Sequence, residues 1–412
     1  MRFGITTFGC RLNKYDSQRI AEEFVRTGYE LVDNPATADI WVINSCAVTT
    51  ATERQVRNWV RRLKRLNPHI KLILTGCAAR YESSVVKTDG IDYILPYITD
   101  IERELNLSHV PYISHFYGYT RAFVKIQEGC DQFCSYCIVP YLRGAPKSRP
   151  IDEIVKEIQQ LIRTGYREII LTGTNIAKYK YDGFTLVDLL NKIIQLPELV
   201  RVGLGSIELC GITDEFVNLL KASSKFNHHL HIPLQSGDNR ILQLMNRPYT
   251  IEEYEAILQV LRKNIPDICL GADVIVGFPG EDRTSFITTY RFIERSPLNY
   301  LHVFRFSPRP FIKANGLPNK VPPYEVKRRS DILHMLSARK FYTFRKQFEG
   351  KVLPVHIERP RDGYLTATSY NYIKMLISST SVVAGDHRNV RVCYVHPNYT
   401  IGEVIDETYR SR

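Results

Sequence analysis

The sequence predicts an α/β protein in three parts: an N-terminal parallel-sheet domain, a central partial barrel of about six strand–helix units resembling a (β/α)6 barrel, and a small antiparallel β-barrel. Two alternations of strand-like and helical patterns, up to about residue 110 and again from Arg121 to Tyr300, predict the first two parts. Short β-branched runs broken by Gly, Asp and Asn predict the third. We expect these parts at residues 1–112, 118–347 and 349–408.

The composition is typical of a globular chain outside the membrane. Hydrophobic residues make up 44% of the sequence and charged residues 24%, and no apolar run is long enough to span a bilayer. The N-terminus enters a strand-like segment directly, without the apolar core of a signal peptide. We therefore expect a cytoplasmic protein with no membrane partner. In that reducing compartment, nine cysteines indicate metal ligands or core thiols rather than disulfides.

Positive charge is concentrated in two segments of this chain, whose formal net charge is +12. The segment Leu301–Phe348 contains eleven Lys and Arg residues against two Asp and Glu residues. All eleven lie between Arg305 and Lys346, which we call the basic segment Arg305–Lys346. A predicted helix carries a second basic run, with Arg54, Arg57, Arg61 and Arg65 on one face. A solvated helix face is one interpretation of the second run. Two basic segments together favour a polyanionic partner such as a nucleic acid.

The N-terminal part places a cysteine after each of three predicted strands. The strands are Phe3–Thr7, Ile40–Asn44 and Lys71–Thr75, separated by helical patterns at Lys14–Thr27 and Thr50–Leu66. The cysteines two or three residues beyond them are Cys10, Cys46 and Cys77. Because the carboxyl ends of parallel strands lie at one edge of a sheet, we expect the three thiols to converge. Single buried cysteines that fill the core are the alternative.

The central part repeats the same rhythm at least six times. Its predicted strands are Ala122–Ile126, Glu168–Thr172, Val200–Leu204, Leu230–Pro233, Gly271–Val276 and Tyr300–Phe304. A glycine fingerprint for NAD is missing, so the repeats indicate a barrel or partial barrel with its active site at the carboxyl ends of the strands. A long loop, Pro308–Pro323, and a helix near Tyr324–Gln347 follow. The strands predicted for the last part are Val352–Glu358, Tyr372–Ser378, Val390–Val395 and Ile401–Glu407.

Three more cysteines stand in the segment EGCDQFCSYC, directly after the first barrel strand. Cys130, Cys134 and Cys137 have the spacing C-x3-C-x2-C. A disulfide would leave one thiol over, and a zinc site would require a fourth ligand nearby. Iron–sulfur clusters are normally held by four cysteines, so three would leave one iron open to a substrate or cofactor.

This segment resembles the signature of the radical S-adenosylmethionine (SAM) enzymes. The resemblance implies that the three cysteines hold a [4Fe-4S] cluster, that SAM binds its open iron, and that an electron from the cluster cleaves SAM to a 5′-deoxyadenosyl radical. Further segments in the family's order support the match: LTGTN, SIE, HIPLQSG and VIVGFPGE, which begin at Leu171, Ser206, His231 and Val274. The cofactor-binding residues that the resemblance implies are Tyr136, Thr172, Gly173, Asn175, Ser206, Glu208, Gln235 and Gly277. Arg143 is a candidate partner for the SAM carboxylate or for a phosphate, and a structural ion pair is the alternative.

The whole chain resembles the radical SAM methylthiotransferases. In that family an N-terminal domain holds a second, auxiliary [4Fe-4S] cluster, which here implies Cys10, Cys46 and Cys77 as its ligands. The last part resembles the TRAM domain, a small RNA-binding barrel, in its segment GYLTATSYNYIKMLI (363–377). The resemblance implies sulfur insertion from the auxiliary cluster followed by methylation from a second SAM.

The segments around two of the cysteines, TFGCRLN and INSCAVT, are most similar to the branch that acts on N6-threonylcarbamoyladenosine at tRNA position 37. The segment HVFRFSPRP is also similar to the tRNA branches, although Phe311 and Ile312 replace the usual Gly-Thr after it. The implied partners are the tRNA anticodon stem-loop and a reducing donor such as flavodoxin or ferredoxin, and we expect a monomer.

Other hypotheses use the same residues differently. The substrate would be isopentenyladenosine-37 of tRNA or an Asp of a ribosomal protein, or the chain would use other radical SAM chemistry with a structural N-terminal cysteine set. A non-enzyme alternative is an iron–sulfur protein that binds RNA or carries electrons. The remaining cysteines, Cys210, Cys269 and Cys393, stand singly near apolar strands and are expected to be core or incidental thiols.

Overall fold

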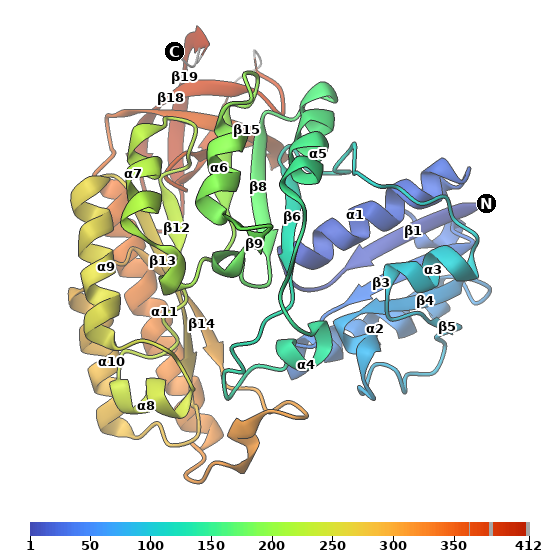
Figure 1. The fold of residues 1–412 in the computed structure, drawn as a ribbon, viewed down its shortest axis with the longest axis horizontal. Helices are drawn as coiled ribbons and strands as arrows, with labels where there is room; N and C mark the ends of the chain where they lie inside the picture. The colour runs from blue at the N-terminus through green and yellow to red at the C-terminus, as the bar shows by residue number, and fades with distance from the viewer. Residues whose placement is uncertain (362, 379–381, 409–412) are drawn as a thin grey trace.

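The N-terminal part is a five-stranded parallel sheet with the strand order β2-β1-β3-β4-β5. The structure is a computed structural model that describes residues 1–361, 363–378 and 382–408. The strands are β1 (Arg2–Thr7), β2 (Glu30–Leu31), β3 (Ile40–Ser45), β4 (Lys71–Gly76) and β5 (Tyr93–Ile94). Because β1, β3 and β4 are adjacent and parallel, the loops that follow them lie at one edge, as the sequence predicted (Figure 1).

Helices cover both faces of this sheet. They are α1 (Arg11–Arg26), η1 (Pro35–Thr37), α2 (Thr50–Leu66), η2 (Cys77–Arg80) and α3 (Ile98–Glu104). Ile20 and Phe24 of α1 pack with Phe3 in one hydrophobic cluster, whereas Val56 and Val60 of α2 belong to another. The second cluster also takes in residues of the central part, so the first two parts share a hydrophobic core. Because this core crosses the boundary between the first two parts, the domain boundaries expected from the sequence stay a prediction.

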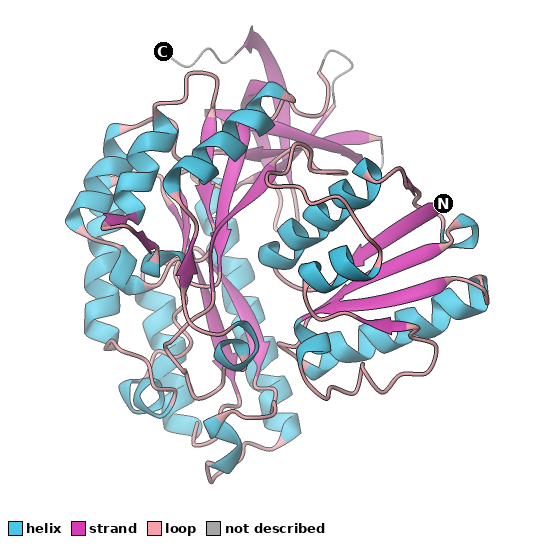
Figure 2. Ribbon diagram, turned by 45° about the vertical axis from the view of Figure 1, so that its right-hand side comes forward, coloured by secondary structure: helices cyan, strands magenta, loops and turns pink. Residues whose placement is uncertain are grey.

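The central part is a partial barrel of six parallel strands in two sheets (Figures 1 and 2). One sheet has the order β11-β8-β6-β7 and the other the order β12-β13-β14, and only β7 is antiparallel to its neighbour. The strands are β6 (Ala122–Glu128), β7 (Lys147–Ser148), β8 (Glu168–Gly173), β11 (Arg201–Leu204), β12 (His229–His231), β13 (Cys269–Val276) and β14 (Tyr300–Arg305). A small hairpin, β9 (Lys180–Tyr181) and β10 (Phe184–Thr185), stands apart.

Helices surround the outer side of the barrel (Figure 2). The helices of the central part are α4 (Val139–Arg143), α5 (Ile151–Arg163), η3 (Ile176–Lys178), α6 (Leu186–Ile194), η4 (Leu209–Gly211), α7 (Asp214–Ala222), α8 (Asn239–Leu244), α9 (Ile251–Asn264), α10 (Arg283–Arg295), η5 (Lys313–Gly316) and α11 (Pro323–Lys346). The largest hydrophobic cluster combines barrel strands with α5, α6, α7 and α9. It also contains Tyr15 of α1, so the N-terminal part packs against β6 at the edge of the barrel.

The C-terminal part is a closed five-stranded barrel with the order β15-β16-β17-β19-β18. Its strands are β15 (Val352–Arg361), β16 (Tyr364–Ser369), β17 (Lys374–Ile377), β18 (His387–Val395) and β19 (Thr400–Thr408). The pairings are antiparallel as predicted, except that β17 and β19 pair in parallel where the barrel closes. Closure leaves no free sheet edge among the described strands of this part.

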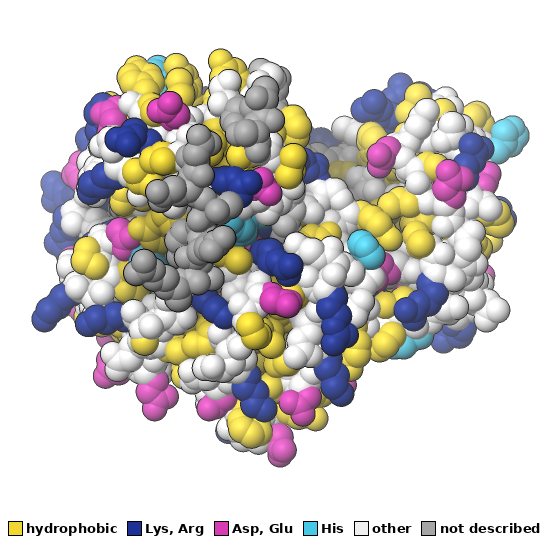
Figure 3. Space-filling model, turned by 90° about the horizontal axis from the view of Figure 1, so that it is seen from above, with side chains coloured by type: hydrophobic (Ala, Val, Ile, Leu, Met, Phe, Trp, Pro, Cys, Tyr) yellow, Lys and Arg dark blue, Asp and Glu magenta, His cyan; other side chains and the backbone are white. Residues whose placement is uncertain are grey.

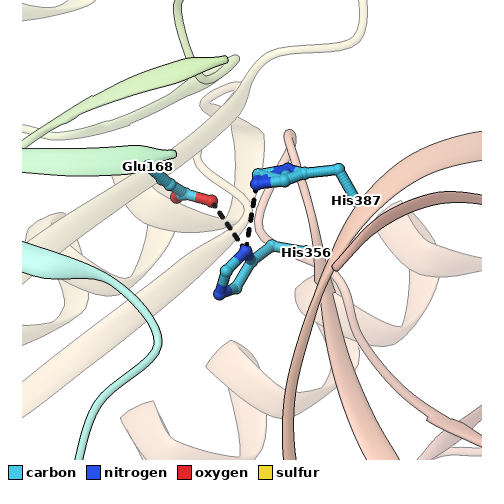
Figure 4. A group of neighbouring side chains, drawn as sticks. All are labelled: Glu168, His356 and His387. Atoms are coloured by element: carbon cyan, nitrogen blue, oxygen red, sulfur yellow. Dashed lines mark hydrogen bonds and ion pairs between the residues drawn. The ribbon is translucent and has the colours of Figure 1, made fainter. Parts of the chain in front are cut away.

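This barrel sits on the amino-terminal end of β8, as the cluster in Figure 4 shows. Nδ1 of His356 lies 3.2 Å from Nε2 of His387 and 3.9 Å from Oε2 of Glu168, the first residue of β8. Nε2 of His356 lies 2.7 Å from the Thr120 hydroxyl. Arg121 pairs with both Glu168 and Glu358. The C-terminal barrel is therefore joined to the sheet at the end opposite to the carboxyl ends of its strands.

Seen from the side that carries this barrel, Lys and Arg side chains are mixed with acidic and hydrophobic ones rather than gathered into one patch (Figure 3). Among the described residues, no helix combines the length and apolar character needed to cross a membrane.

Candidate active site between two sets of cysteines

The first cysteine set lies at the carboxyl edge of the N-terminal sheet. Cys10 precedes α1, Cys46 follows β3, and Cys77 opens η2 directly after β4. Gly9 has a φ of 108°, and a Cβ at this position would lie 2.7 Å from Cβ and 3.0 Å from Sγ of Cys46. A side chain at Gly9 would thus push apart the Cys10 and Cys46 loops, which are in contact here.

Two polar side chains hold the three loops together. The Asn13 amide donates to the carbonyls of Phe8 and Ser45, both at 2.9 Å, and so joins the Cys10 loop to the Cys46 loop. The Ser45 hydroxyl donates to the carbonyl of Thr75 at 2.6 Å and accepts from the amide of Ala78 at 3.2 Å. The sequence prediction that these three cysteines converge agrees with this arrangement, because each loop is bonded to the next.

The chemistry of this set fits a metal cluster. All three are free thiols. Burial, followed by the neighbouring Cys77 and Cys10, raises the pKa of the Cys46 thiol to about 12. A buried thiol is protonated at neutral pH where burial outweighs the nearby positive charge of Arg143, whereas a bound metal deprotonates it. Three thiols that follow neighbouring strands, with no disulfide among them, are a donor set that suits iron.

The second set lies on the loop that follows β6, the first barrel strand. The loop is bonded at both ends: the Cys130 amide donates to the Gly144 carbonyl, and the Ser135 amide to the Met245 carbonyl, both at 2.9 Å. The Ser135 carbonyl in turn accepts from the Ala314 amide at 2.8 Å. The loop that carries Cys130, Cys134 and Cys137 is therefore held by α4, by the end of α8 and by η5.

Glycine is required where this loop begins. Gly129 has a φ of 82°, and a Cβ there would overlap the carbonyl oxygen of Ala145. The Gln127 amide donates to the Gly129 carbonyl at 2.7 Å, and its carbonyl oxygen accepts from the Asn175 amide at 2.9 Å. Gln127 thus connects the cysteine loop to the end of the second barrel strand.

Arg247 is the residue of this site that the sequence analysis missed. Its side chain is 1% exposed and pairs with Glu208. It donates to Sγ of Cys134 at 3.3 Å and to the Tyr136 hydroxyl at 3.4 Å. A buried guanidinium stabilises negative charge on Cys134 and pairs with a carboxylate already predicted to bind the cofactor. The only signal in the sequence is an Arg at the end of a short apolar helix, which by itself indicates nothing.

Asn175 carries a buried acceptor without a protein partner. The residue is 4% exposed, and its Oδ1 has no hydrogen-bond partner among the described residues. Thr172 and Gly173 precede it at the end of β8, and Thr172 is also buried. Because native proteins rarely leave such an acceptor unpaired, Oδ1 indicates a bound donor. An ammonium group, as in SAM, is such a donor.

The other predicted cofactor residues differ in burial and in surroundings. Gln235 is buried and has a φ of 68°, an unusual backbone conformation of the kind found at functional sites. Ser206 is exposed. At Gly277 the space for a Cβ is filled by Val326 of α11, so helix packing accounts for this glycine. Contact of these residues with a cofactor stays a prediction.

Arg143 lies between the two cysteine sets. It ends α4, six residues after Cys137, but its guanidinium donates to Oδ1 of Asn13 at 2.7 Å and to Oε1 of Glu128 at 2.6 Å. The negative charges nearby, Cys77 first, raise its pKa further above the ordinary value against the effect of burial. Its guanidinium therefore faces the first cysteine set rather than open solvent, and it pairs with protein groups here.

The three other cysteines belong to neither set and differ in burial. Cys269 is fully buried beside Tyr300 and Phe344 in a hydrophobic cluster, and Cys210 and Cys393 are exposed. Two histidines beside Tyr300 form a hydrogen-bonded network. His229 and His231 both bond the Tyr300 hydroxyl, and His231 bonds Asp273 at 2.8 Å.

Two family models match the chain. The Radical SAM superfamily matches residues 124–293, and the Uncharacterized protein family UPF0004 matches residues 2–95. These ranges contain the second and the first cysteine set, respectively.

Curated relatives match most of the chain. "Threonylcarbamoyladenosine tRNA methylthiotransferase MtaB" of Aquifex aeolicus is 35% identical, over 86% of this chain and 92% of the relative. The protein of the same name from Bacillus subtilis is 33% identical over 97% and 95%. "tRNA-2-methylthio-N(6)-dimethylallyladenosine synthase" of Thermodesulfovibrio yellowstonii is 33% identical over 97% and 98%.

Among solved structures, the radical SAM methyltransferase TsrM from Kitasatospora setae matches with a TM-score of 0.57 at 12% identity, over 76% of this chain and 74% of TsrM. The cobalamin-dependent radical SAM enzyme OxsB matches with a TM-score of 0.53 over 83% and 57%. These likenesses show the fold. Together with the relatives that span the chain, they identify the protein as a member of the radical SAM methylthiotransferases, enzymes that transfer methylthio groups.

Proposed function

We propose that the protein converts N6-threonylcarbamoyladenosine at position 37 of tRNA to its 2-methylthio form, at C2 of the adenine. The names of the relatives from Aquifex aeolicus and Bacillus subtilis support this substrate. The segments TFGCRLN and INSCAVT favour the same branch. The single observation that carries the proposal is the junction at Arg143, where the loop of one cysteine set is bonded to the loop of the other through Asn13.

Two [4Fe-4S] clusters and SAM are the cofactors that this reaction requires. Cys130, Cys134 and Cys137 would hold the cluster that binds SAM, and Cys10, Cys46 and Cys77 would hold the auxiliary cluster. When bound, these groups supply the radical that removes hydrogen from an unreactive carbon, the sulfur that replaces it, and a methyl group from a second SAM.

The chain's own side chains orient and balance these groups. Arg247 places a buried positive charge beside Cys134 and fixes Tyr136 and Glu208 around it. Oδ1 of Asn175 offers an acceptor to the SAM ammonium. Arg143 offsets thiolate charge at the first set, because it lies beside Cys10 and Cys77. Each cysteine set thus has a buried positive side chain beside it.

Dimethylallyladenosine-37 is the second candidate substrate, because a relative with that named activity is 33% identical over nearly the whole chain. A ribosomal-protein side chain suits the basic segment Arg305–Lys346 less well, since that segment favours a polyanion. We further propose that the anticodon stem-loop is the part of tRNA bound, that flavodoxin or ferredoxin supplies electrons, and that the protein acts as a monomer in the cytoplasm.

The test is a reaction of the reconstituted enzyme with two anticodon stem-loops, one carrying threonylcarbamoyladenosine and one carrying dimethylallyladenosine at position 37. Nucleosides are then analysed by mass spectrometry. The proposal expects the methylthio product from the first RNA and little from the second. The reverse preference would make dimethylallyladenosine the substrate. No product from either RNA would reject a tRNA substrate.

A further inference from the structure

Four aromatic side chains form a continuous row beside the two cysteine sets. Neighbouring rings in this row, which we call the aromatic arc, contact one another in the order Tyr81, Phe311, Tyr141 and Phe133. The ring centroids of consecutive members are 6.5, 6.0 and 5.5 Å apart. The first ring follows Cys77 by four residues and the last directly precedes Cys134, so the arc runs from one cysteine loop to the other.

Three rings of the arc are exposed although they stand in ordered segments. Phe311 is 60% exposed, and Phe133 and Tyr141 are each 43% exposed. Exposed aromatic rings scattered singly are ordinary, but a row of contacting rings at the mouth of a proposed active site is a surface with one chemical character.

The backbone at both Phe311 and Phe133 is in the left-handed region. Their φ angles are 68° and 45°, a conformation that bulky residues rarely adopt. Such outliers persist where the surroundings enforce them, and they cluster at functional sites. Here the same unusual conformation presents two rings of one row to solvent.

Neighbouring buried residues hold Phe311 in this position. Arg309 and Glu53, each 5% exposed at the side chain, form an ion pair that Tyr81 joins through its hydroxyl. On the other side, Ile312 is 4% exposed and packs in the hydrophobic cluster of the N-terminal part. The segment is therefore fixed on both sides of Phe311, while the Phe311 ring itself is exposed.

The helix that contacts one end of the arc carries basic side chains. Glu53, which bonds Tyr81, belongs to α2, and exposed arginines of the same helix are Arg54, Arg61, Arg62 and Arg65. Exposed Lys313 follows Phe311 by two residues. Aromatic rings that stack on bases, next to cations that bind phosphates, are the combination with which proteins bind single-stranded nucleic acid.

We propose that the aromatic arc binds an unstacked base of the tRNA anticodon loop, next to the adenosine that is modified, with Phe311 as the principal stacking ring. This inference rests on the proposed function and names a part of that site which the cysteines do not supply. Tyr141 of the arc belongs to α4 and Phe311 to the segment after β14. In Figure 1 these two elements lie on the side of the molecule opposite to the C-terminal barrel. Stacking there would hold the loop open, so that position 37 can enter the barrel.

The test uses anticodon stem-loops in which 2-aminopurine replaces each nucleotide flanking adenosine 37 in turn, because stacking on an aromatic ring quenches its fluorescence. The reconstituted wild-type enzyme is compared with Phe311→Gly, Phe311→Trp and Val260→Ala. Val260 is a 37% exposed apolar residue of α9, outside the basic segment, and serves as the control. Phe311→Gly removes the ring and relieves the positive φ, so its melting temperature should not fall.

We expect quenching in the wild type at one or both flanking positions. Phe311→Gly should lose that quenching and raise the dissociation constant about tenfold, within the range for the loss of one base–aromatic stack. Phe311→Trp and the control should behave as the wild type. Equal affinity and equal quenching in Phe311→Gly would overturn the stacking proposal while leaving the proposed function intact. A wild type that does not bind the stem-loop would overturn both.

Discussion

At the residue scale, the candidate site depends on side chains that join segments far apart in the sequence. Asn13 bonds the Cys46 loop and Arg143, and Arg247 bonds Cys134 across 113 residues of chain. These side chains are buried, and each satisfies several partners at once. Their effect is to place two cysteine sets side by side while supplying positive charge to each.

The two cysteine sets should be separable by mutation. In Cys46→Ala we expect SAM cleavage to continue and the methylthio product to disappear, because only the first set loses a ligand. The measurement is 5′-deoxyadenosine and modified nucleoside in the same reaction. Cys393→Ala, at an exposed cysteine of the C-terminal barrel, is the control and should change neither. Loss of SAM cleavage in Cys46→Ala would contradict the assignment of separate roles.

Replacement of Asn175 should weaken SAM binding without lowering the stability of the protein. Asn175→Ala removes a buried acceptor that has no protein partner, so the melting temperature should stay level or rise slightly. If Oδ1 accepts from the SAM ammonium, the dissociation constant for SAM should rise about tenfold, as for a lost hydrogen bond to a charged group. Calorimetry of SAM binding checks this. Unchanged affinity would remove Asn175 from the cofactor site.

At the scale of elements, the turn after β6 fixes the second cysteine set. Its backbone turns through Gly129, where a Cβ would overlap the Ala145 carbonyl, and returns through Gly144, where a Cβ would meet nothing within 4 Å. Both glycines have positive φ, at 82° and 70°. The two positions therefore share the conformational requirement and differ only in the space available.

This pair provides a matched comparison. Gly129→Ala should distort the loop and lower the bound iron by roughly half, because the second cluster is lost while the first set is untouched. Gly144→Ala carries only the cost of the left-handed conformation and should keep most of its iron. Iron and sulfide analysis of the reconstituted proteins measures the difference. Equal iron in the two variants would show that the turn does not fix the cluster loop.

At the scale of the whole molecule, the C-terminal barrel and the cysteine sets lie at opposite ends of the central sheet. Glu168 begins β8 beside His356 of the barrel (Figure 4). The loop after β8 carries Asn175. Six residues of strand separate these ends by about 20 Å. If the barrel contacts RNA, that contact is therefore with a part of the tRNA other than the base being modified.

The barrel junction should make stability depend on pH. Burial lowers the pKa of His356 to about 4, from an ordinary value near 6.5. The folded protein thus binds fewer protons than the unfolded chain between these values, and stability falls as the pH falls below about 6.5. The groups that face His356 are Glu168, His387, Arg121 and Glu358.

Between pH 7.5 and pH 5, the lowered pKa of His356 should reduce the free energy of unfolding by about 2 kcal/mol. Urea unfolding of the wild type and His356→Gln at both pH values gives the comparison. The wild type should lose about 2 kcal/mol more than the variant, and the difference between the two proteins cancels acid effects on other groups. An equal loss would show that His356 is not neutral at the junction.

The sequence predicted the features that depend on period and spacing. Alternating patterns specified both parallel sheets, and the placement of Cys10, Cys46 and Cys77 after successive strands predicted their convergence. It did not indicate Arg247, Asn13 or the aromatic arc as a unit, because those contacts join residues that only the folded chain brings together. The strands predicted for the C-terminal part pass from Val352–Glu358 directly to Tyr372–Ser378, so strand β16, Tyr364–Ser369, was missed. The position of the C-terminal barrel depends on contacts such as His356 with Glu168, which have no local pattern.

The most direct test of the central claim compares the tRNA nucleosides of a strain that lacks this gene with those of its parent and a complemented strain. Mass spectrometry should show loss of 2-methylthio-N6-threonylcarbamoyladenosine, accumulation of N6-threonylcarbamoyladenosine, and recovery only with a gene that encodes all six cysteines of the two sets. An unchanged nucleoside profile in the deletion strain would contradict the account.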